Sequence, residues 1–339
     1  MSRAEIAFED LLLMRRRTRV GSPPPRHEHR PPRHEHRPLL RERWPLRRAV
    51  VVLLFAGSAG AAIYPTAATW ISDRLHANEL SGYVESVAGM LPVERSALLD
   101  AARAYNGLLP SGPVIDPYSL GADGIPEALA PGAERYLETL AIGPDAMMGR
   151  IRIDEIGVSL PIYHGTGERS LSQGVGHLYG TALPIGGSGT HSVLTSHSGL
   201  LNATLFTRLG ELAIGDEFTI IVLDETLVYE VDRIETVTPE RTEGLRATPG
   251  EDYVTLVTCT PTGVNTHRLL VRGHRVPAPL EDTGERLAIA GATGDAGFPW
   301  WALGYLAALV AAILLSRLMV RRGQSAPEPS PGPRRRGLT

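Results

Sequence analysis

The segment YVTLVTCTPTG (253–263) joins a run of β-branched and apolar residues to a proline and a glycine that end it. This pattern predicts a strand over Tyr253–Thr258, with Cys259 at its end, entering a loop. Nine residues further on, Arg268 opens a second such run, Arg268–Val276, so an antiparallel return would bring the guanidinium beside the sulfur. Because rigid sheets present reactive groups where strands enter loops, Cys259 is a candidate nucleophile, and a buried inert thiol is the alternative.

Further runs of the same kind follow one another from Gly149 onward, each bounded by turn-forming residues. They are Arg150–Ile153, Val158–Ile162, His191–Thr195, Glu217–Leu223 and Thr226–Ile234. Seven or eight short strands with few helices between them predict a mainly β fold, either a barrel or a sandwich. Upstream, apolar residues at helical spacing predict a helical region over Asn78–Leu108 with a break at Pro92. Residues 109–133 are rich in proline, glycine and aspartate and predict a loop.

The charge distribution divides the chain into an acidic centre and basic ends. All 34 basic residues among the 339 are arginines, and the formal net charge is only −3. Residues 73–298 nevertheless carry 15 arginines against 30 acidic residues. Because an acidic surface repels a phosphate backbone, this composition argues against nucleic-acid binding. The single cysteine also excludes an internal disulfide and a cysteine-based zinc site.

Two apolar segments flank the acidic centre. The first runs from Ala49 to Ile71 and the second from Trp300 to Val320, so each reaches the roughly 20 residues that cross a bilayer. The first could instead be a cleaved signal peptide, but its leader is long for one, which favours a retained anchor. Arginines precede the first segment and follow the second. Both ends are therefore expected in the cytoplasm, with 73–298 outside it, at the plasma membrane.

The N-terminal tail contains a perfect tandem repeat, PPRHEHR, at 24–30 and 31–37. Its His-x-His pairs could bind a metal, but low complexity and many prolines favour a disordered tail. The sequence thus predicts a disordered Arg/His/Pro-rich cytoplasmic tail (1–48), a transmembrane helix (49–71), a helical region and loop (72–133), a β domain (134–280), a linker (281–299), a second transmembrane helix (300–320) and a cytoplasmic tail (321–339).

A cysteine mechanism needs a proton donor for the leaving amine, and the acidic centre offers seven histidines. His197 comes just after the strand that His191 begins, so it lies at a strand end like Cys259. Spacing alone favours His197 and leaves His191 as the second candidate. Arg268 stays charged at physiological pH and can stabilise both a thiolate and an oxyanion, while a surface salt bridge is its alternative role.

Several motifs together resemble the sortases, and in particular the class C, pilus-assembling branch. The resemblance covers roughly 130–276 and rests on TLVTCTP (255–261) and GVNTHRLLVRG (263–273), preceded by LPIYHGT (160–166), GVGHL (174–178), TALPIGG (181–187) and TSHSGL (195–200). It implies a sortase-type closed β-barrel of about eight strands, with N-terminal helices and a lid loop, flanked by two transmembrane helices. The sequence departs from the family at Ser196, Ser198 and Thr262, which puts fine substrate preference in question.

The resemblance also implies roles for individual residues. The family's nucleophile falls on Cys259, its general acid and base on His197, and its catalytic arginine on Arg268. Class C members carry a lid with an Asp-Pro-aromatic motif, which falls on Asp116, Pro117 and Tyr118. An ordinary turn is the alternative there. No cofactor and no metal are expected.

The function implied is transpeptidation at an LPxTG-like sorting signal, cleaved between Thr and Gly through a thioester and joined to a lysine amine of another pilin. Expected partners are pilin or surface proteins with such C-terminal signals, and membrane lipid. A housekeeping sortase that anchors proteins to peptidoglycan is the first alternative. A secreted thiol protease and a non-catalytic binding barrel are the others.

Overall fold

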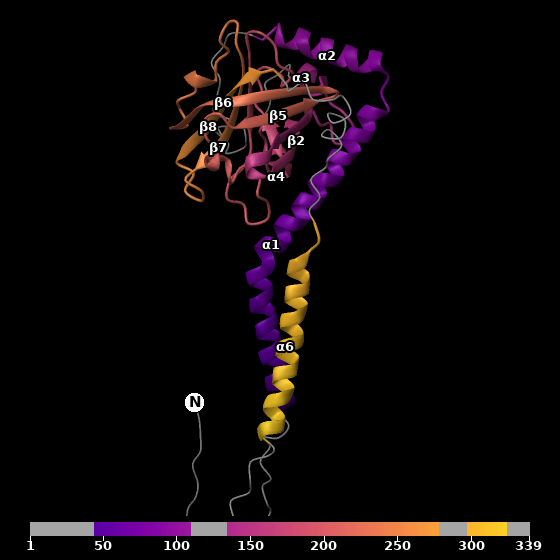
Figure 1. The fold of residues 1–339 in the computed structure, drawn as a ribbon, viewed down its shortest axis with the longest axis vertical. Helices are drawn as coiled ribbons and strands as arrows, with labels where there is room; N and C mark the ends of the chain where they lie inside the picture. Colours follow the sequence, from indigo (N-terminus) through magenta and orange to yellow (C-terminus); the bar gives the residue numbers. More distant parts are fainter. Residues whose placement is uncertain (1–43, 110–133, 278–296, 324–339) are drawn as a thin grey trace, which may run out of the picture. The chain divides into compact units, whose positions relative to one another are not determined.

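A computed structural model describes residues 44–109, 134–277 and 297–323 of the chain (Figure 1). The helices are α1 (Trp44–Ala88), α2 (Pro92–Asn106), α3 (Glu134–Glu138), α4 (Glu168–Gln173) and α6 (Trp300–Gly323), with short 3-10 turns η2 (Asp154–Ile156), η3 (Leu209–Glu211) and η4 (Glu243–Leu245). The strands are β1 (Gly149–Ile153), β2 (Val158–His164), β3 (Val175–His177), β4 (Thr190–Thr195), β5 (Glu217–Val222), β6 (Glu225–Val237), β7 (Asp252–Thr260) and β8 (His267–Val276).

The strands close into a barrel in the order β1-β2-β3-β4-β7-β8-β6-β5. This confirms the predicted mainly β, closed-barrel fold of about eight strands. Strand β7 lies between β4, to which it is parallel, and β8, to which it is antiparallel. Strand β3 was not predicted, because its three residues are too short for an alternation pattern to be visible.

Alternation along the strands sends one set of side chains into the barrel and the other outward. Val254 and Leu256 of β7, Leu194 of β4 and Val271 of β8 belong to the main buried core. The alternate residues of β7, Thr255, Val257 and Cys259, therefore lie on the outer face. This alternation is what brings the candidate reactive side chains out of the core.

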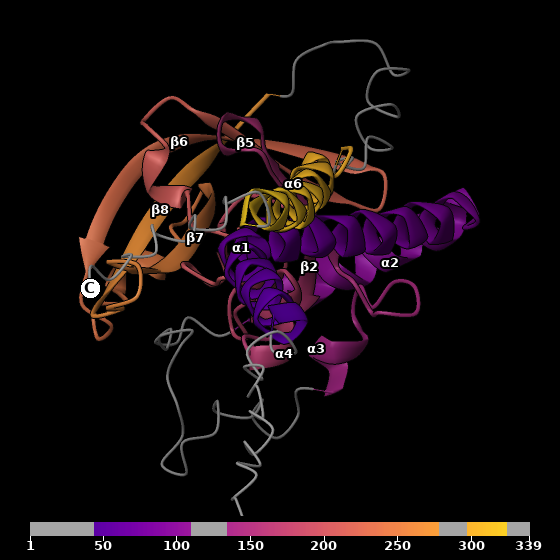
Figure 2. The ribbon, with the colours of Figure 1, turned by 90° about the horizontal axis from the view of Figure 1, so that it is seen from below.

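Helix α1 runs without interruption from the apolar segment into the helical region predicted separately (Figure 2). Its C-terminal half packs on the barrel through Leu80, Tyr83 and Val87, which are all buried. The Tyr83 hydroxyl accepts a hydrogen bond from the Leu223 amide at 2.8 Å and donates one to the Met148 carbonyl at 3.3 Å. The helix therefore extends well beyond the predicted boundary at residue 71, because one of its faces is covered by the barrel. The predicted break at Pro92 is confirmed as the start of α2.

Helices α1 and α6 are long and apolar enough to cross a membrane. They lie side by side in Figures 1 and 2. The Tyr305 hydroxyl donates to the Ala56 carbonyl at 3.2 Å, and the rings of Trp70 and Trp301 meet edge to face with centroids 6.3 Å apart. The Tyr305 side chain also lies close to Gly60 of α1. The two predicted spans thus form a helical pair.

Candidate active site

Cys259 is the second-last residue of β7 and is partly exposed on the outer face. In the register between β7 and β8 it stands directly opposite Arg268. The antiparallel return predicted from the sequence is therefore present. Because β8 starts one residue earlier, at His267, Arg268 is held by strand pairing and not by a loop.

His197 follows the end of β4, and hydrogen bonds extend the β4–β7 pairing past Thr195. The Ser196 amide donates to the Val257 carbonyl at 3.2 Å, and the Thr258 hydroxyl donates to the Ser196 carbonyl at 2.8 Å. The Ser198 hydroxyl then donates to the Cys259 carbonyl at 2.7 Å. Since Thr195 pairs with Val257, a step of two residues on each strand puts His197 on the same face as Cys259.

The turn after His197 depends on a glycine. Gly199 has φ +75°, in the left-handed region, and a side chain there would collide with Thr262 in the loop after Cys259. The backbone can therefore approach the β7–β8 loop closely. This approach keeps the His197 turn against the strand that carries the thiol.

Arg268 is the buried member of the three, with 9% of its surface exposed. Its Nη1 donates to the carbonyls of Asn265 at 3.3 Å and His267 at 3.4 Å. Asn265 sits in a left-handed conformation that turns its carbonyl toward this group. A buried guanidinium held in this way can stabilise negative charge on a neighbouring sulfur or oxygen, because little water screens it.

Sequence reasoning missed one residue at this end of the barrel. The Glu168 carboxylate, in the first turn of α4, lies 3.1 Å from Nε2 of His197. Its side chain is 74% exposed, whereas that of His197 is 22% exposed. No local pattern marks Glu168, since it belongs to the β2–β3 connection and meets His197 only after the barrel closes.

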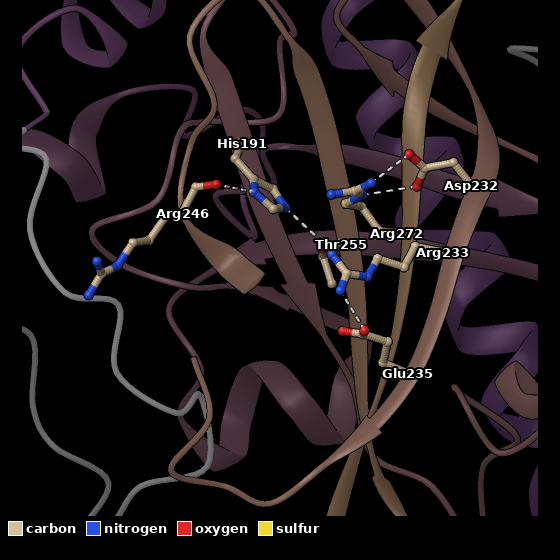
Figure 3. Close-up of polar contacts among 7 residues, drawn as sticks. All are labelled: His191, Asp232, Arg233, Glu235, Arg246, Thr255 and Arg272. Atoms are coloured by element: carbon tan, nitrogen blue, oxygen red, sulfur yellow. Dashed lines mark hydrogen bonds and ion pairs between the residues drawn. The ribbon is translucent and has the colours of Figure 1, made fainter. Parts of the chain in front are cut away.

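His191, the second candidate, lies at the opposite end of β4 (Figure 3). It is buried, its Nδ1 donates to the Arg246 carbonyl at 3.0 Å, and its Nε2 accepts from the Thr255 hydroxyl at 2.7 Å. Burial lowers its pKa below the ordinary value. Both ring nitrogens are engaged in hydrogen bonds within the fold, and the length of β4 separates His191 from Cys259.

His177 of β3 is likewise a structural histidine. It is fully buried, its Nε2 donates to the Ala182 carbonyl at 2.8 Å, and its Nδ1 accepts from the Tyr136 hydroxyl at 2.9 Å. Burial lowers the pKa of His177 to about 3. The ring is therefore neutral at physiological pH and ties α3 to the barrel.

A second arginine of β8 points to the same face as Arg268 but is fully engaged. Arg272 donates from Nε and Nη2 to the Asp232 carboxylate at 2.9 and 2.7 Å (Figure 3). Its guanidinium also lies 4.2 Å from the ring centroid of Tyr253. Between the two arginines lies a small apolar cluster capped by Leu245 of η4. Its buried members are Leu178, Val193, Leu245, Val257 and Leu270.

Two sets of predicted residues lie outside the described part of the chain. They are the lid residues Asp116, Pro117 and Tyr118, and the His-x-His repeats at 24–37. Among the residues that the structure does describe, no group of three or more His, Cys, Asp or Glu could hold a metal ion. The chemistry available at the described site is that of a thiol between a histidine and a buried arginine. Such an arrangement can carry out nucleophilic acyl transfer.

A family model for the sortase domain matches residues 151–276. Among curated proteins, sortase A of Streptococcus agalactiae serotype III is 32% identical over 142 residues, which are 41% of this chain and 55% of that protein. The chain therefore spans about half the length of that curated relative.

Solved structures show the same similarity. Sortase C-1 from Actinomyces oris is 50% identical with a TM-score of 0.52, and the match covers 55% of this chain and 100% of that one. A pilus-related sortase C of Group B Streptococcus is 43% identical with a TM-score of 0.51, covering 58% of this chain and 96% of that one.

Proposed function

Because the chain belongs to the sortase family of cysteine transpeptidases, we propose that Cys259, His197 and Arg268 carry its reaction. The proposed substrate is a protein with an LPxTG-like sorting signal, cut between Thr and Gly and joined to a lysine amine of another pilin. The observation that carries the proposal is the register of the β4–β7–β8 strand ends, which flanks the thiol with a histidine and a buried arginine.

In the first half-reaction the Cys259 thiolate attacks the Thr carbonyl of the signal. The carbonyl electrons move onto oxygen, and the Arg268 guanidinium stabilises this oxyanion. As the C–N bond breaks, protonated His197 gives its proton to the leaving glycine amine. The products are a thioester on Cys259 and the released C-terminal peptide.

In the second half-reaction a lysine amine attacks the thioester carbonyl. The ammonium first loses a proton to His197, which is neutral after the first step, and the C–S bond then breaks. Cys259 leaves as the thiolate, and the new amide nitrogen gives its second proton to water. One acyl bond is exchanged for another, so the energy of the original peptide bond is conserved and no external energy source is required.

The pilus branch is supported by the class C structures among the similar proteins and by the second apolar helix. The Asp-Pro-Tyr motif at 116–118 supports it from the sequence, and we propose that this segment acts as a lid over Cys259. A housekeeping sortase, which would use a peptidoglycan amine, remains the alternative.

The proposed location is the plasma membrane, with both termini in the cytoplasm and the barrel outside it. The arginines near the N-terminal end of α1 and near the C-terminal end of α6 support this orientation. The contacts of Tyr305 with Ala56 and of Trp70 with Trp301 support two spans that cross together as a hairpin. Trp70 and Trp301 would then lie at the outer interface, where tryptophan is enriched.

The test is mass spectrometry of the full-length chain in micelles, mixed with LPxTG-type peptides. We expect an adduct on Cys259 whose mass corresponds to the peptide up to Thr. A lysine-containing peptide added next should give a ligated product, whereas a peptidoglycan-type amine as the preferred acceptor would favour the housekeeping alternative. Release of hydrolysed peptide alone, with every amine tested, would indicate a protease. If none of the peptides forms an adduct, the proposal is overturned.

A further inference from the structure

The contact between Glu168 and His197 places a carboxylate beside the proposed acid and base, on the side away from Arg268. In the strand order, Arg268 lies on β8, Cys259 on β7 and His197 at the end of β4. Glu168 comes from α4, in the connection that leads to β3, the next strand along. The described site is thus positive on one flank of the thiol and negative on the other.

Helix α4, which carries Glu168, is anchored to the barrel although the Glu168 side chain is mostly exposed. Leu171 is buried with 3% exposure, and the Ser170 hydroxyl donates to the His164 carbonyl at 2.9 Å. Strand β3 also lies so close to the start of the β2–β3 connection that a side chain at Gly176 would collide with the Gly165 carbonyl. The helix therefore presents Glu168 to solvent from a firmly anchored base.

We propose that Glu168 recruits the cationic acceptor, the ammonium group of the incoming lysine, to the thioester. This inference rests on the proposed function. After His197 has protonated the leaving amine, its ring is neutral and no longer balances the Glu168 charge. The carboxylate then attracts the ammonium to the vicinity of the imidazole ring that must remove its proton. No covalent bond to Glu168 forms or breaks.

The arrangement separates the two substrates by charge. The oxyanion develops beside Arg268, which repels an ammonium, while the ammonium arrives beside Glu168. Because the carboxylate is largely exposed, its interaction with a cation is that of a surface ion pair, and we expect roughly a two- to five-fold preference for a charged over an uncharged nucleophile.

The experiment is a competition for one thioester. Full-length enzyme in micelles is given an LPxTG-type peptide together with a lysine-containing peptide and hydroxylamine, which is uncharged at neutral pH. The ratio of the two products reports how the acyl-enzyme divides between them and does not depend on how fast it formed. We expect Glu168→Gln to lower the lysine-to-hydroxylamine ratio roughly two- to five-fold and Glu168→Asp to restore most of it. High salt should lower the wild-type ratio toward that of the Gln variant.

Glu217→Gln is the matched control, because Glu217 is an exposed carboxylate on β5, across the barrel from β4 in the strand order. Its product ratio should equal that of the wild type. If Glu168→Gln reduces both products equally, the residue positions His197 and the recruitment idea is wrong. An unchanged ratio with normal turnover also overturns it. Both results require the thioester to form, so they are distinguishable from failure of the proposed function, in which no thioester appears.

Discussion

The barrel contains two kinds of histidine site, and they differ in how their ring nitrogens are used. His177 and His191 are buried, and each bonds through both nitrogens to the fold. His197 lies at a strand end, partly exposed, with an exposed carboxylate at Nε2. A buried ring with two fixed partners cannot exchange a proton without breaking hydrogen bonds, whereas the ring at the strand end can.

The two ends of the outer face of β7 and β8 also differ, here in the partners of an arginine. At one end Arg272 is bound bidentately by Asp232 and stacked on Tyr253. At the other end Arg268 donates to the backbone carbonyls of Asn265 and His267, and it stands opposite Cys259. The two arginines of β8 thus differ in position: Arg272 is part of a bidentate ion pair, whereas Arg268 stands opposite the reactive thiol.

The largest effect is expected from removing the thiol. Cys259→Ala should abolish acyl-enzyme formation, because the chain has no other cysteine. Thermal unfolding should stay near that of the wild type, since the side chain is partly exposed. Mass spectrometry with a sorting peptide checks the first expectation, and continued polymerisation by this variant would contradict the assignment.

Next in size is the contrast between the two arginines of β8. Arg268→Lys is expected to lower turnover on the order of 100-fold or more, because a point charge does not reproduce the planar fork. Arg272→Lys should instead lower stability and leave turnover per folded molecule near normal. Steady-state kinetics and denaturant unfolding on both variants test this. Near-normal turnover of Arg268→Lys would shift the role to another arginine.

The proposed lid gives an intermediate effect at the reactive end. If Asp116 and Tyr118 hold the resting enzyme closed, replacing both by Ala should speed alkylation of Cys259 by a small reagent, roughly 10- to 100-fold. The upper bound is the inverse of the open fraction. Rates of alkylation followed by mass spectrometry provide the measurement, and equal rates in both proteins would mean that this segment does not gate the thiol.

The smallest effect on turnover is expected from the buried histidines, which contribute to stability. His177 has a pKa near 3 in the fold and about 6.5 when unfolded, so below pH 6.5 the unfolded chain binds more protons. The stability present above pH 6.5 is therefore lost as the pH falls toward 3, by up to about 1.4 kcal/mol per pH unit from this residue.

Denaturant unfolding at several pH values checks this expectation. His177→Gln should flatten the acid slope and lower stability at neutral pH, where it leaves the Tyr136 hydroxyl without its ring partner. His197→Gln is the matched comparison and should lower turnover with little change in unfolding at neutral pH. A wild-type slope in the His177 variant would show that this histidine does not carry the acid sensitivity.

Local patterns determined seven of the eight strands, the two apolar segments and the candidate thiol. Each of the seven predicted runs lies in a strand, apart from one residue at the end of β5, because alternation and turn residues are visible in a short window. The pairing of Cys259 with Arg268 was also predictable, since an antiparallel return between neighbouring strands follows from the length of the loop. The resemblance to the sortases supplied His197, which spacing favoured but did not separate from His191.

Tertiary structure decided what depends on contacts between distant segments. Closure of the barrel puts β4 beside β7, although about 60 residues separate them, and this parallel pairing makes His197 the neighbour of Cys259. The same closure buries both nitrogens of His191, continues α1 along the barrel through Tyr83, and brings Glu168 to His197. Composition and periodicity report which faces are apolar, but the identity of a polar partner across the fold depends on the register and direction of non-adjacent strands, which no local window contains.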